Sequence, residues 1–492
     1  MRGCVVLVLA LLVSSARADD VAPVPGIPAP GPPSSVAPDA ASMQPEDEFG
    51  PLLLIEAIEI RGNKSTQEEI IRRALPIQPG DVLHASDKRL RNARFKVLAL
   101  GFFREVNFSM KKGTERGNVI IEIEVVERGT FVLHKLWFGR TPLTPYWAGV
   151  DFAERNLLGL GISIGGAAFY GVHGSVAGAR DQWAGELRIS DGSLRGSRWG
   201  AQGALTLVHG SEVYRVAGES DDLVNFRAFP YRRFGARLGA TYDLTALARL
   251  SATLRLESID AELPVAPTRT LPDGTITNVD LFLEPGESRI VTAGLGFDRD
   301  TRSDPILPHS GSRITAAFEV GTSAIVSDYD FATLFARFEH WWPFLSERHA
   351  IGMYLSGGVV VGNAPRFDRI YVSDFNRMLA PRPLGMVLST AGPINFLGTA
   401  KNKESYGELG GIAAIEYTTR LFRGVGKKRV FGGDLFVSTG MWALAQTADF
   451  QVRDTSFWHA LPADLYVNAG LRVDTDLGIF EFSFANILGR LR

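Results

Sequence analysis

Cysteine is nearly absent from this chain of 492 residues: the one instance is Cys4, just ahead of the apolar run from Val5 to Val13. The N-terminus follows the charged, apolar and small-residue order of a signal peptide, so we expect residues 1–18 to be removed after Ala18. The mature chain would then hold no thiol, which excludes disulfide bonds and cysteine metal sites. Because Cys4 precedes the apolar run, it is not placed as a lipidation site.

Long apolar runs and an excess of one charge are missing as well. Beyond the signal no segment approaches the roughly 18 apolar residues of a membrane helix, which excludes a helical membrane protein. With a net charge of −2 the chain has no excess of basic residues, so nucleic acid is not an expected partner. The sequence has no His-Glu-x-x-His motif and no phosphate loop ending in Gly-Lys-Ser/Thr, so we expect no cofactor and no metal. Its 52 glycines suit strands and tight turns.

A serine-hydrolase formula occurs once, at Gly161-Ile162-Ser163-Ile164-Gly165. The nucleophile elbow that this formula describes needs a strand, a sharp turn and a helix. Here the stretch lies inside an alternating, glycine-rich segment that favours a continuous strand. We therefore expect no enzyme, and the enzymatic alternative requires an activity that depends on Ser163.

The N-terminal part divides into a spacer and a small folded unit. Prolines recur through residues 19–50, a composition typical of a semi-flexible linker. Residues 51–129 predict the order strand, helix, helix, strand, strand. The sequence Ser65-Thr66-Gln67-Glu68 has the form of a capping box and predicts the start of the first helix. A second helix is predicted from near Ser86, with Gly101 as its C-terminal cap.

From about residue 145 onward the hydrophobic pattern has a period of two. Leucine and alanine at 250, 252, 254 and 256 alternate with polar residues, and such segments recur to the end of the chain. A soluble β-sandwich or barrel also has alternating strands. The export signal and the small or aromatic residues on the dry faces favour an outer-membrane β-barrel, in which lipid replaces the protein core. About 15 candidate strands can be counted, near the even numbers usual for such barrels.

Several stretches resemble the BamA/TamA outer-membrane assembly superfamily. Residues 52–128 resemble a single POTRA domain, above all at residues 100–106 and 119–127. The sequence from Glu154 to Gly161 resembles the family's opening barrel hairpin. The family's mid-barrel turn motif is matched by Phe297 to Arg313, and its residues of interest are Asp298, Arg299, Asp300 and Gly311. The resemblance implies a signal peptide, a small α+β POTRA domain and an antiparallel transmembrane β-barrel of about 16 strands over residues 130–492.

In this family a long loop folds back into the lumen, and an arginine of this loop binds an acidic residue of the wall. The equivalent loop here is about residues 363–406, and its best candidate is Arg382. The alternation of the next strand points Glu416 into the lumen. The resemblance therefore implies a bidentate lock between Arg382 and Glu416, with an ordinary solvated arginine as the alternative. Ser438 replaces the aspartate that serves as the family's second acidic partner.

The resemblance also implies a lateral gate where the first and last barrel strands meet. We expect this gate between residues 149–156 and residues 479–487, with gate residues at Glu154, Asn156, Gly159, Phe480, Phe482 and Phe484. The three phenylalanines should face lipid. The C-terminus leaves two possibilities open: the closing strand is residues 478–488 with a short tail, or the family's last strand is absent.

The implied function is to insert other β-barrel proteins into the outer membrane, with the POTRA domain receiving client strands and the gate templating them. The implied partners are outer-membrane lipid, unfolded outer-membrane or secreted client proteins, and periplasmic accessory proteins. The implied location is the bacterial outer membrane, with the N-terminal domain in the periplasm. The alternatives are a two-partner-type secretion pore and a structural or passive diffusion barrel.

Overall fold

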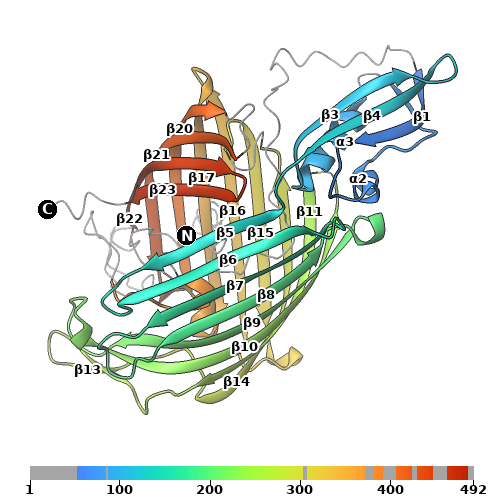
Figure 1. The fold of residues 1–492 in the computed structure, drawn as a ribbon. Coiled ribbons are helices and arrows are strands. Elements are labelled where there is room, and N and C mark those ends of the chain that lie inside the picture. Colours follow the sequence, from blue (N-terminus) through green and yellow to red (C-terminus); the bar gives the residue numbers. More distant parts are fainter. Residues whose placement is uncertain are drawn as a thin grey trace, which may run out of the picture.

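The structure is a computed structural model that describes residues 52–84, 87–245, 247–302, 307–371, 382–391, 406–423, 429–446 and 463–485. These residues form an N-terminal α+β module and one large antiparallel sheet that curves into a barrel (Figure 1). The predicted signal peptide and linker, residues 1–18 and 19–50, lie outside the described residues. Among the helices of the described part, none has the length and apolarity to cross a membrane.

The N-terminal module is a four-stranded sheet of order β2-β1-β4-β3 with two helices. Its elements are β1 (Leu52–Arg61), α2 (Glu68–Ala74), β2 (Val82–His84), α3 (Lys88–Ala99), β3 (Phe103–Lys112) and β4 (Asn118–Glu127). Its core is made of aliphatic and aromatic residues from every layer, among them Ile58, Ile71, Val97, Phe103, Ile121 and Ile123. The predicted order is confirmed, with the short strand β2 added between the helices.

Helix α2 begins differently from the prediction. Its N-cap is Gln67 rather than Ser65, and Gln67 makes no side-chain cap hydrogen bond. The amides of Ser65 and Thr66 donate instead to the carboxylate of Glu127 at the end of β4, at 3.0 and 2.7 Å. The capping-box prediction was wrong because Glu127 accepts from the Ser65 amide in place of the Glu68 carboxylate, which binds Arg72.

The barrel sheet contains 15 strands in the described residues, and each pairs with its neighbours in sequence order. They are β5 (Phe131–Gly139), β6 (Tyr146–Leu157), β7 (Ile162–Val172), β8 (Gln182–Asp191), β9 (Trp199–Arg215), β10 (Phe226–Asp243), β11 (Ala248–Ala261), β14 (Gly286–Asp300), β15 (Gly311–Gly321), β16 (Phe331–Phe344), β17 (Ser346–Gly362), β20 (Leu409–Arg423), β21 (Val430–Ala445), β22 (Ala463–Thr475) and β23 (Gly478–Ala485).

Short elements occupy the connections. They are the strands β12 (Thr268–Thr270), β13 (Ile276–Asn278), β18 (Ile370–Tyr371) and β19 (Tyr406–Gly407) and the 3₁₀ turns η1 (Leu194–Gly196), η2 (Leu223–Asn225), η3 (Ser323–Ile325), η4 (Arg366–Asp368) and η6 (Pro383–Gly385). The turns that follow β6, β8 and β22 lie at the end of the barrel that carries the N-terminal module, which we call the module end. The other end is the far end.

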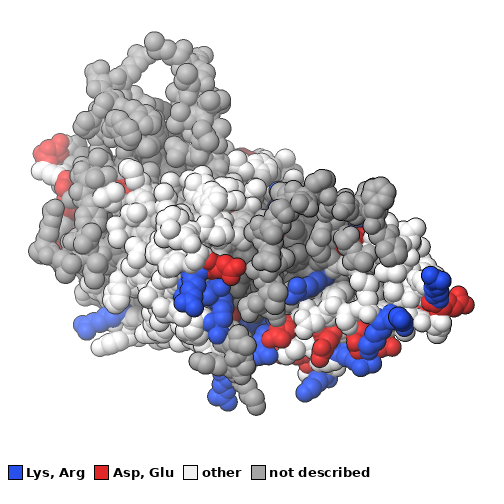
Figure 2. All heavy atoms as spheres, turned by 90° about the horizontal axis from the view of Figure 1, so that it is seen from above, with Lys and Arg blue, Asp and Glu red and all other residues white. Residues whose placement is uncertain are grey.

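The barrel wall is apolar outside and charged inside. Leu187 and Leu205 oppose each other across β8 and β9 and are 68% and 52% exposed. Their neighbours Glu186 and Arg188 point to the other face and are buried. Figure 2 shows charged side chains gathered mainly on the right, where the module lies, and a largely uncharged wall beside it. A barrel in water would have the reverse polarity, so the transmembrane barrel is confirmed.

Candidate functional site

The loop between β17 and β20 folds into the lumen. We call its described parts, residues 363–371 and 382–391, the lumen segment. Phe367, Ile370 and Met386 of this segment are buried in one apolar cluster with wall residues that include Tyr231 and Ile259. The contacts described below reach strands β8, β9 and β11, so the segment crosses the interior rather than covering one wall.

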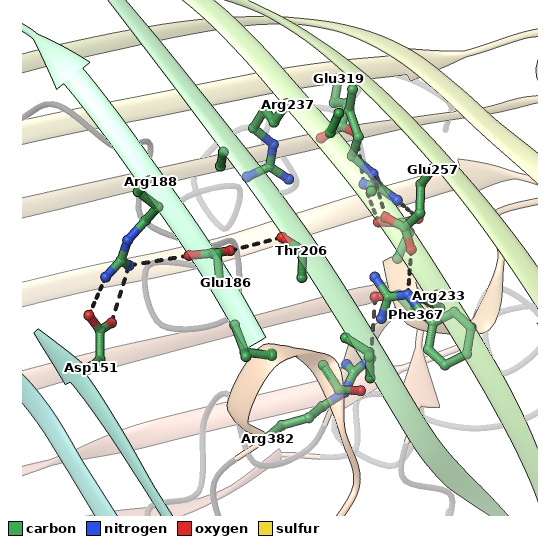
Figure 3. Close-up of a pocket in the computed structure, with 18 of the residues that line it drawn as sticks. Asp151, Glu186, Arg188, Thr206, Arg233, Arg237, Glu257, Glu319, Phe367 and Arg382 are labelled. Atoms are coloured by element: carbon green, nitrogen blue, oxygen red, sulfur yellow. Dashed lines mark hydrogen bonds and ion pairs between the residues drawn. The ribbon is translucent and has the colours of Figure 1, made fainter. Parts of the chain in front are cut away.

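The first anchor of the lumen segment is a charge network on β11. Arg255 donates to both oxygens of Asp368, at 2.9 and 2.7 Å. It also contacts Glu257 at 3.2 Å and Glu319 at 3.0 Å, and Glu257 in turn binds Arg233. Figure 3 shows Glu257, Glu319, Arg233 and Phe367 together on this side. A bidentate pair inside such a network fixes both position and orientation of the carboxylate.

The second anchor is on β9, where Glu212 is fully buried. Arg366 donates to this carboxylate at 2.8 Å and to the carbonyl of Val213 at 2.7 Å. The hydroxyl of Tyr406 donates to the same carboxylate at 2.7 and 2.8 Å, and the Arg366 guanidinium lies 4.3 Å from the Tyr406 ring. Every group of this buried cluster is therefore satisfied by another.

The second part of the lumen segment is held by its backbone. Gln182 on β8 donates to the carbonyl of Val387 at 3.0 Å, and the hydroxyl of Thr141 donates to the carbonyl of Leu388. Beside the segment lies a cavity of about 100 Å³. Figure 3 shows Arg188 paired with Asp151 on its other side. The charges that line the cavity thus brace the wall and the segment against each other.

The structure does not bring Arg382 and Glu416 together, so the predicted lock is corrected. Arg382 is buried, and it donates to the carbonyls of Phe367 at 3.2 Å and Gly385 at 3.3 Å within the lumen segment. Glu416 does face the lumen, but its partner is Arg472 on β22, one of whose bonds measures 2.9 Å.

Arg472 reaches Glu416 by passing over the strand between them. Its guanidinium lies 3.8 Å from the ring of Phe436 on β21, and Ser438 opposes Glu416 in the ladder. It also binds Glu481 on β23 at 2.9 Å. Along β22 Arg472 alternates with apolar Leu471 and Val473, and this alternation is the sequence signal that places it in the lumen.

The mid-barrel motif braces the turn between β14 and β15. Asp298 binds Arg313 at 2.7 Å, and Asp300 binds Arg302, which reaches Glu339 on β16 at 3.1 Å. Arg299 is exposed and lies outside this network. Gly311 has φ +91°, and a Cβ there would lie 2.2 Å from the carbonyl oxygen of Thr301, so glycine is required.

The gate prediction is wrong on its first strand. The barrel begins with β5, and residues 149–156 belong to β6, the second strand. Glu154 and Asn156 lie at the end of β6, and Gly159 lies in the turn after it. The sequence pattern missed β5 because apolar residues occupy both of its faces and a bulge between Leu133 and Lys135 shifts its alternation.

The last described strand, β23, carries the three predicted phenylalanines. Phe482 and Phe484 are 63% and 69% exposed, and Phe480 is half-buried. The final strand of the prediction, residues 479–487, extends past Ala485, and residues 486–492 lie outside the described residues.

Strands β5 and β23 are the two ends of the curved sheet, and we call the line between them the seam (Figure 1). Each forms a ladder with one neighbour, β5 with β6 and β23 with β22. Within the described residues a single backbone hydrogen bond crosses the seam, from the Leu133 amide to the Leu477 carbonyl at 2.7 Å. With 15 alternating strands, β5 and β23 run in the same direction, away from the module end.

Comparisons with known families match both parts of the chain. The Omp85 superfamily domain model matches residues 156–490, and the POTRA model, described as a surface antigen variable number repeat, matches residues 53–128.

Curated relatives carry the name outer membrane protein assembly factor BamA. The protein of Neorickettsia risticii (strain Illinois) is 33% identical over 105 residues, 21% of this chain and 14% of that protein. The protein of Nitratidesulfovibrio vulgaris is 23% identical over 327 residues, 65% of this chain and 36% of that protein. The matches span well under half the length of either relative. Among solved structures, CdiB from Escherichia coli has a TM-score of 0.55 at 11% identity over 88% of this chain and 72% of that chain, a similarity of fold alone.

Proposed function

Because the chain belongs to the Omp85 superfamily and is an outer-membrane β-barrel with a POTRA domain, we propose that it inserts other β-barrel proteins into the outer membrane. The POTRA domain receives client strands in the periplasm, and the seam templates them. The observation that carries this proposal is the pair of strand edges at β5 and β23, joined across the seam by one backbone hydrogen bond among the described residues.

The physical need for such a seam comes from the backbone. A client strand that enters lipid with unpaired amides and carbonyls costs several kcal/mol for each such group. A helper that offers a strand edge removes this cost while the client barrel forms. No nucleotide is required, because burial of the client's apolar surface supplies the free energy.

The direction of the edges specifies the client strand. Since β5 and β23 run in the same direction, a strand that runs from the far end to the module end is antiparallel to both. All strands that pair with each other in the barrel sheet are antiparallel. We therefore expect the templated strand to enter with its C-terminal end toward the periplasm.

The POTRA domain offers a second edge. In the order β2-β1-β4-β3, strand β3 pairs with β4 on one side, and its ten residues leave the other side as a sheet edge. Strand addition to such an edge supplies main-chain hydrogen bonds without demanding one client sequence. This suits a domain that receives many unfolded outer-membrane proteins, with or without periplasmic accessory proteins.

A dedicated secretion pore is the second candidate, and the fold similarity to CdiB favours it. The lumen segment, anchored at Arg255 and Glu212, counts against passage of a polypeptide through the interior. Depletion of the protein separates the candidates: loss of many outer-membrane proteins indicates insertion, and loss of one secreted protein indicates a pore. Loss of neither indicates a structural or passive barrel.

The direct test is to close the seam covalently. Leu133→Cys with Leu477→Cys places a disulfide where the one cross-seam hydrogen bond lies. The control, Leu136→Cys with Val150→Cys, joins β5 to β6, which already pair. Purified protein in liposomes is offered an unfolded outer-membrane protein, and insertion is followed by heat-modifiable gel mobility. We expect the seam disulfide to abolish insertion until it is reduced, and full insertion by the oxidised seam variant would refute the proposal.

We also propose that the protein has no hydrolytic activity. Ser163 pairs with Ser190 inside the β7–β8 ladder, where extended backbone does not form a nucleophile elbow. Ser163→Ala should leave insertion unchanged.

A further inference from the structure

The apolar outer wall of the barrel is bounded by arginines on β14. Arg289 and Arg299 of this strand are both exposed, and the outward positions between them hold only apolar side chains: Val291, Ala293, Leu295 and Phe297. The two arginines are ten residues apart, which is about 34 Å along a strand at about 3.4 Å per residue. With the tilt of about 40° usual in such barrels, this length covers about 26 Å of membrane depth, close to their apolar band of about 25 Å. Arg289 and Arg299 therefore lie at the two edges of the lipid-facing band, at the level of lipid headgroups.

The edge at the far end continues from β14 across the neighbouring strands. On β10 the last outward apolar residue is Phe234, which is 57% exposed, and the next outward residue is Arg232. The first outward polar residues beyond the band on β9, β10, β11 and β14 form what we call the edge line: His209, Arg232, Ser258 and Arg289. None of these four residues is acidic. Trp183 on β8 extends the edge line, because its ring stacks on His209 with the ring centroids 5.8 Å apart.

Two carboxylates lie one outward position beyond the edge line. Asp260 on β11 and Glu287 on β14 are exposed and directly opposite each other in the ladder. Arg232 is opposite Asp260, whereas Arg289 is opposite Ser258, so the two arginines are two strands apart and offset by two residues. This register puts their Cα atoms roughly 12 Å apart. Within the part of the chain that the structure describes, no hydrogen bond or ion pair engages the side chains of these two arginines and two carboxylates.

We propose that this patch binds a membrane glycolipid whose headgroup carries two phosphates. Guanidinium groups bind phosphate by charge-assisted hydrogen bonds, and two arginines roughly 12 Å apart suit two separated phosphates better than the one phosphate of a phospholipid. Asp260 and Glu287 repel phosphate, but they accept hydrogen bonds from sugar hydroxyls. The flat pair of Trp183 and His209 offers a surface on which a sugar ring packs.

The place of the patch in the barrel is compatible with the proposed function. Strands β9, β10, β11 and β14 are the fifth to eighth strands counted from β5 in the sheet of 15, so they lie on the wall opposite the seam. A lipid bound there leaves the seam open to a client strand. The inference rests on the proposed function for its leaflet, because a POTRA domain in the periplasm puts the far end of the barrel in the outer leaflet.

The test measures lipid binding by the full chain in detergent. The protein is titrated with diphosphoryl lipid A, an acylated disaccharide with two phosphates, and the lipid-bound fraction is read by native mass spectrometry. Arg232→Gln and Arg289→Gln should each weaken binding about tenfold, because each removes a charge-assisted hydrogen bond. Arg299→Gln is the matched control, since this arginine is exposed on the same strand as Arg289 but at the other edge of the band, and it should leave binding unchanged. Heat-modifiable mobility verifies that each barrel is folded.

Two further lipids and one further variant test the chemical class of the ligand. Monophosphoryl lipid A should bind about tenfold more weakly than the diphosphoryl form, because one arginine then lacks a phosphate. The double change Asp260→Ala with Glu287→Ala should weaken binding of diphosphoryl lipid A, since the sugar hydroxyls lose their acceptors. The same change should not weaken binding of phosphatidylglycerol, which has a phosphate but no sugar. Tighter binding of lipid A by this variant would show that the carboxylates only repel phosphate, and would overturn the assignment to a glycolipid.

The remaining outcomes separate this site from the proposed function. Unchanged lipid A binding in the double variant Arg232→Gln with Arg289→Gln overturns the site, and equal affinity for the two forms of lipid A overturns the two-phosphate ligand. Insertion of a client is measured separately, in liposomes made of phospholipid alone. A protein that binds lipid A through these arginines but inserts no client would preserve the site and refute the proposed function. Insertion by a protein whose lipid A binding ignores these arginines would do the opposite.

Discussion

Arg255 on β11 binds both carboxylate oxygens of Asp368, at 2.9 and 2.7 Å, and so ties the lumen segment to the barrel wall. Both side chains are less than a tenth exposed. The carboxylate of Glu319 accepts from the same guanidinium at 3.0 Å. Because the pair is buried, loss of Asp368 removes the bidentate partner of Arg255 and leaves Glu257 and Glu319 as its acidic contacts.

Asp368→Ala should therefore destabilise the protein, by less than the roughly 3–5 kcal/mol of a buried charge left unpaired, because Glu257 and Glu319 still contact Arg255. The measurement is the free energy of unfolding by urea in detergent, together with protease cleavage of the lumen segment, which should accelerate. Arg299→Ala is the control, since this arginine is exposed and outside the networks. Equal stability of the two variants would show that Asp368 does not anchor the segment.

Glu416 and Arg472 should be coupled, whereas Glu416 and Arg382 should not. A double-mutant cycle with Glu416→Gln and Arg472→Leu is expected to give a coupling energy of about 0.5–3 kcal/mol, because the two side chains share a bidentate contact. The matching cycle with Arg382→Leu should be additive, since Arg382 binds carbonyls of the lumen segment. Urea unfolding of the four proteins in each cycle provides the data. The reverse pattern would restore the lock expected from the family resemblance.

The difference between Arg472 and Arg382 shows how much of the lumen contacts could be predicted from the sequence. Alternation along a strand places Glu416 and Arg472 in the lumen, because side-chain direction has a strict period of two. Which arginine binds Glu416 depends on whether a side chain extends across β21 and on the path of the lumen segment. Neither of these is specified by a periodic pattern in the sequence. The same limit explains β5, whose bulge and two apolar faces hide its pattern.

The N-terminal module was predictable for a related reason. Its helices and strands are specified by local spacing, so their order could be derived without the barrel. The start of α2 could not be predicted, because the amides before it donate to Glu127, which lies about 60 residues further along the chain. Asn156 and Gly159 were predicted as gate residues of the first strand, but they lie at the end of β6 and contact the POTRA domain. Their contact with Thr66 and Gln67 joins two separately folding units, and no pattern within one segment records such a contact.

Acid should loosen the loop of residues 64–67, which precedes α2, through Glu127. Burial alone would raise the pKa of Glu127, but the backbone amides of Thr66 and Ser65 outweigh it and hold the pKa below its ordinary value of 4.5. A lowered pKa in the folded state stabilises the loop above the unfolded value of about 4.5, and this stabilisation is lost as the pH falls through the folded-state pKa.

The measurement is the hydrogen-exchange protection factor of residues 64–67, which corrects for the intrinsic pH dependence of exchange. We expect protection to fall below about pH 4 in the wild-type protein. Glu127→Gln should have low protection at every pH, while Glu124→Gln, an exposed change on the same strand, should behave as wild type. A wild-type pH profile in Glu127→Gln would assign the effect to another group.

The outward leucines test whether lipid surrounds the barrel. Leu187 on β8 is 68% exposed, and Leu52 on the POTRA domain is 63% exposed. In water the same change at two equally exposed leucines has similar, small effects, so Leu187→Lys and Leu52→Lys would differ little. In a membrane a lysine on the lipid face near the midplane costs about 2–4 kcal/mol, and the cost falls toward the interfaces. We expect Leu187→Lys to lower the free energy of unfolding in liposomes by this amount, and Leu52→Lys to change it by less than about 0.5 kcal/mol.

Refolding of Leu187→Lys into bilayers of decreasing thickness should recover part of the loss, because a thinner bilayer brings the ammonium group closer to the headgroups.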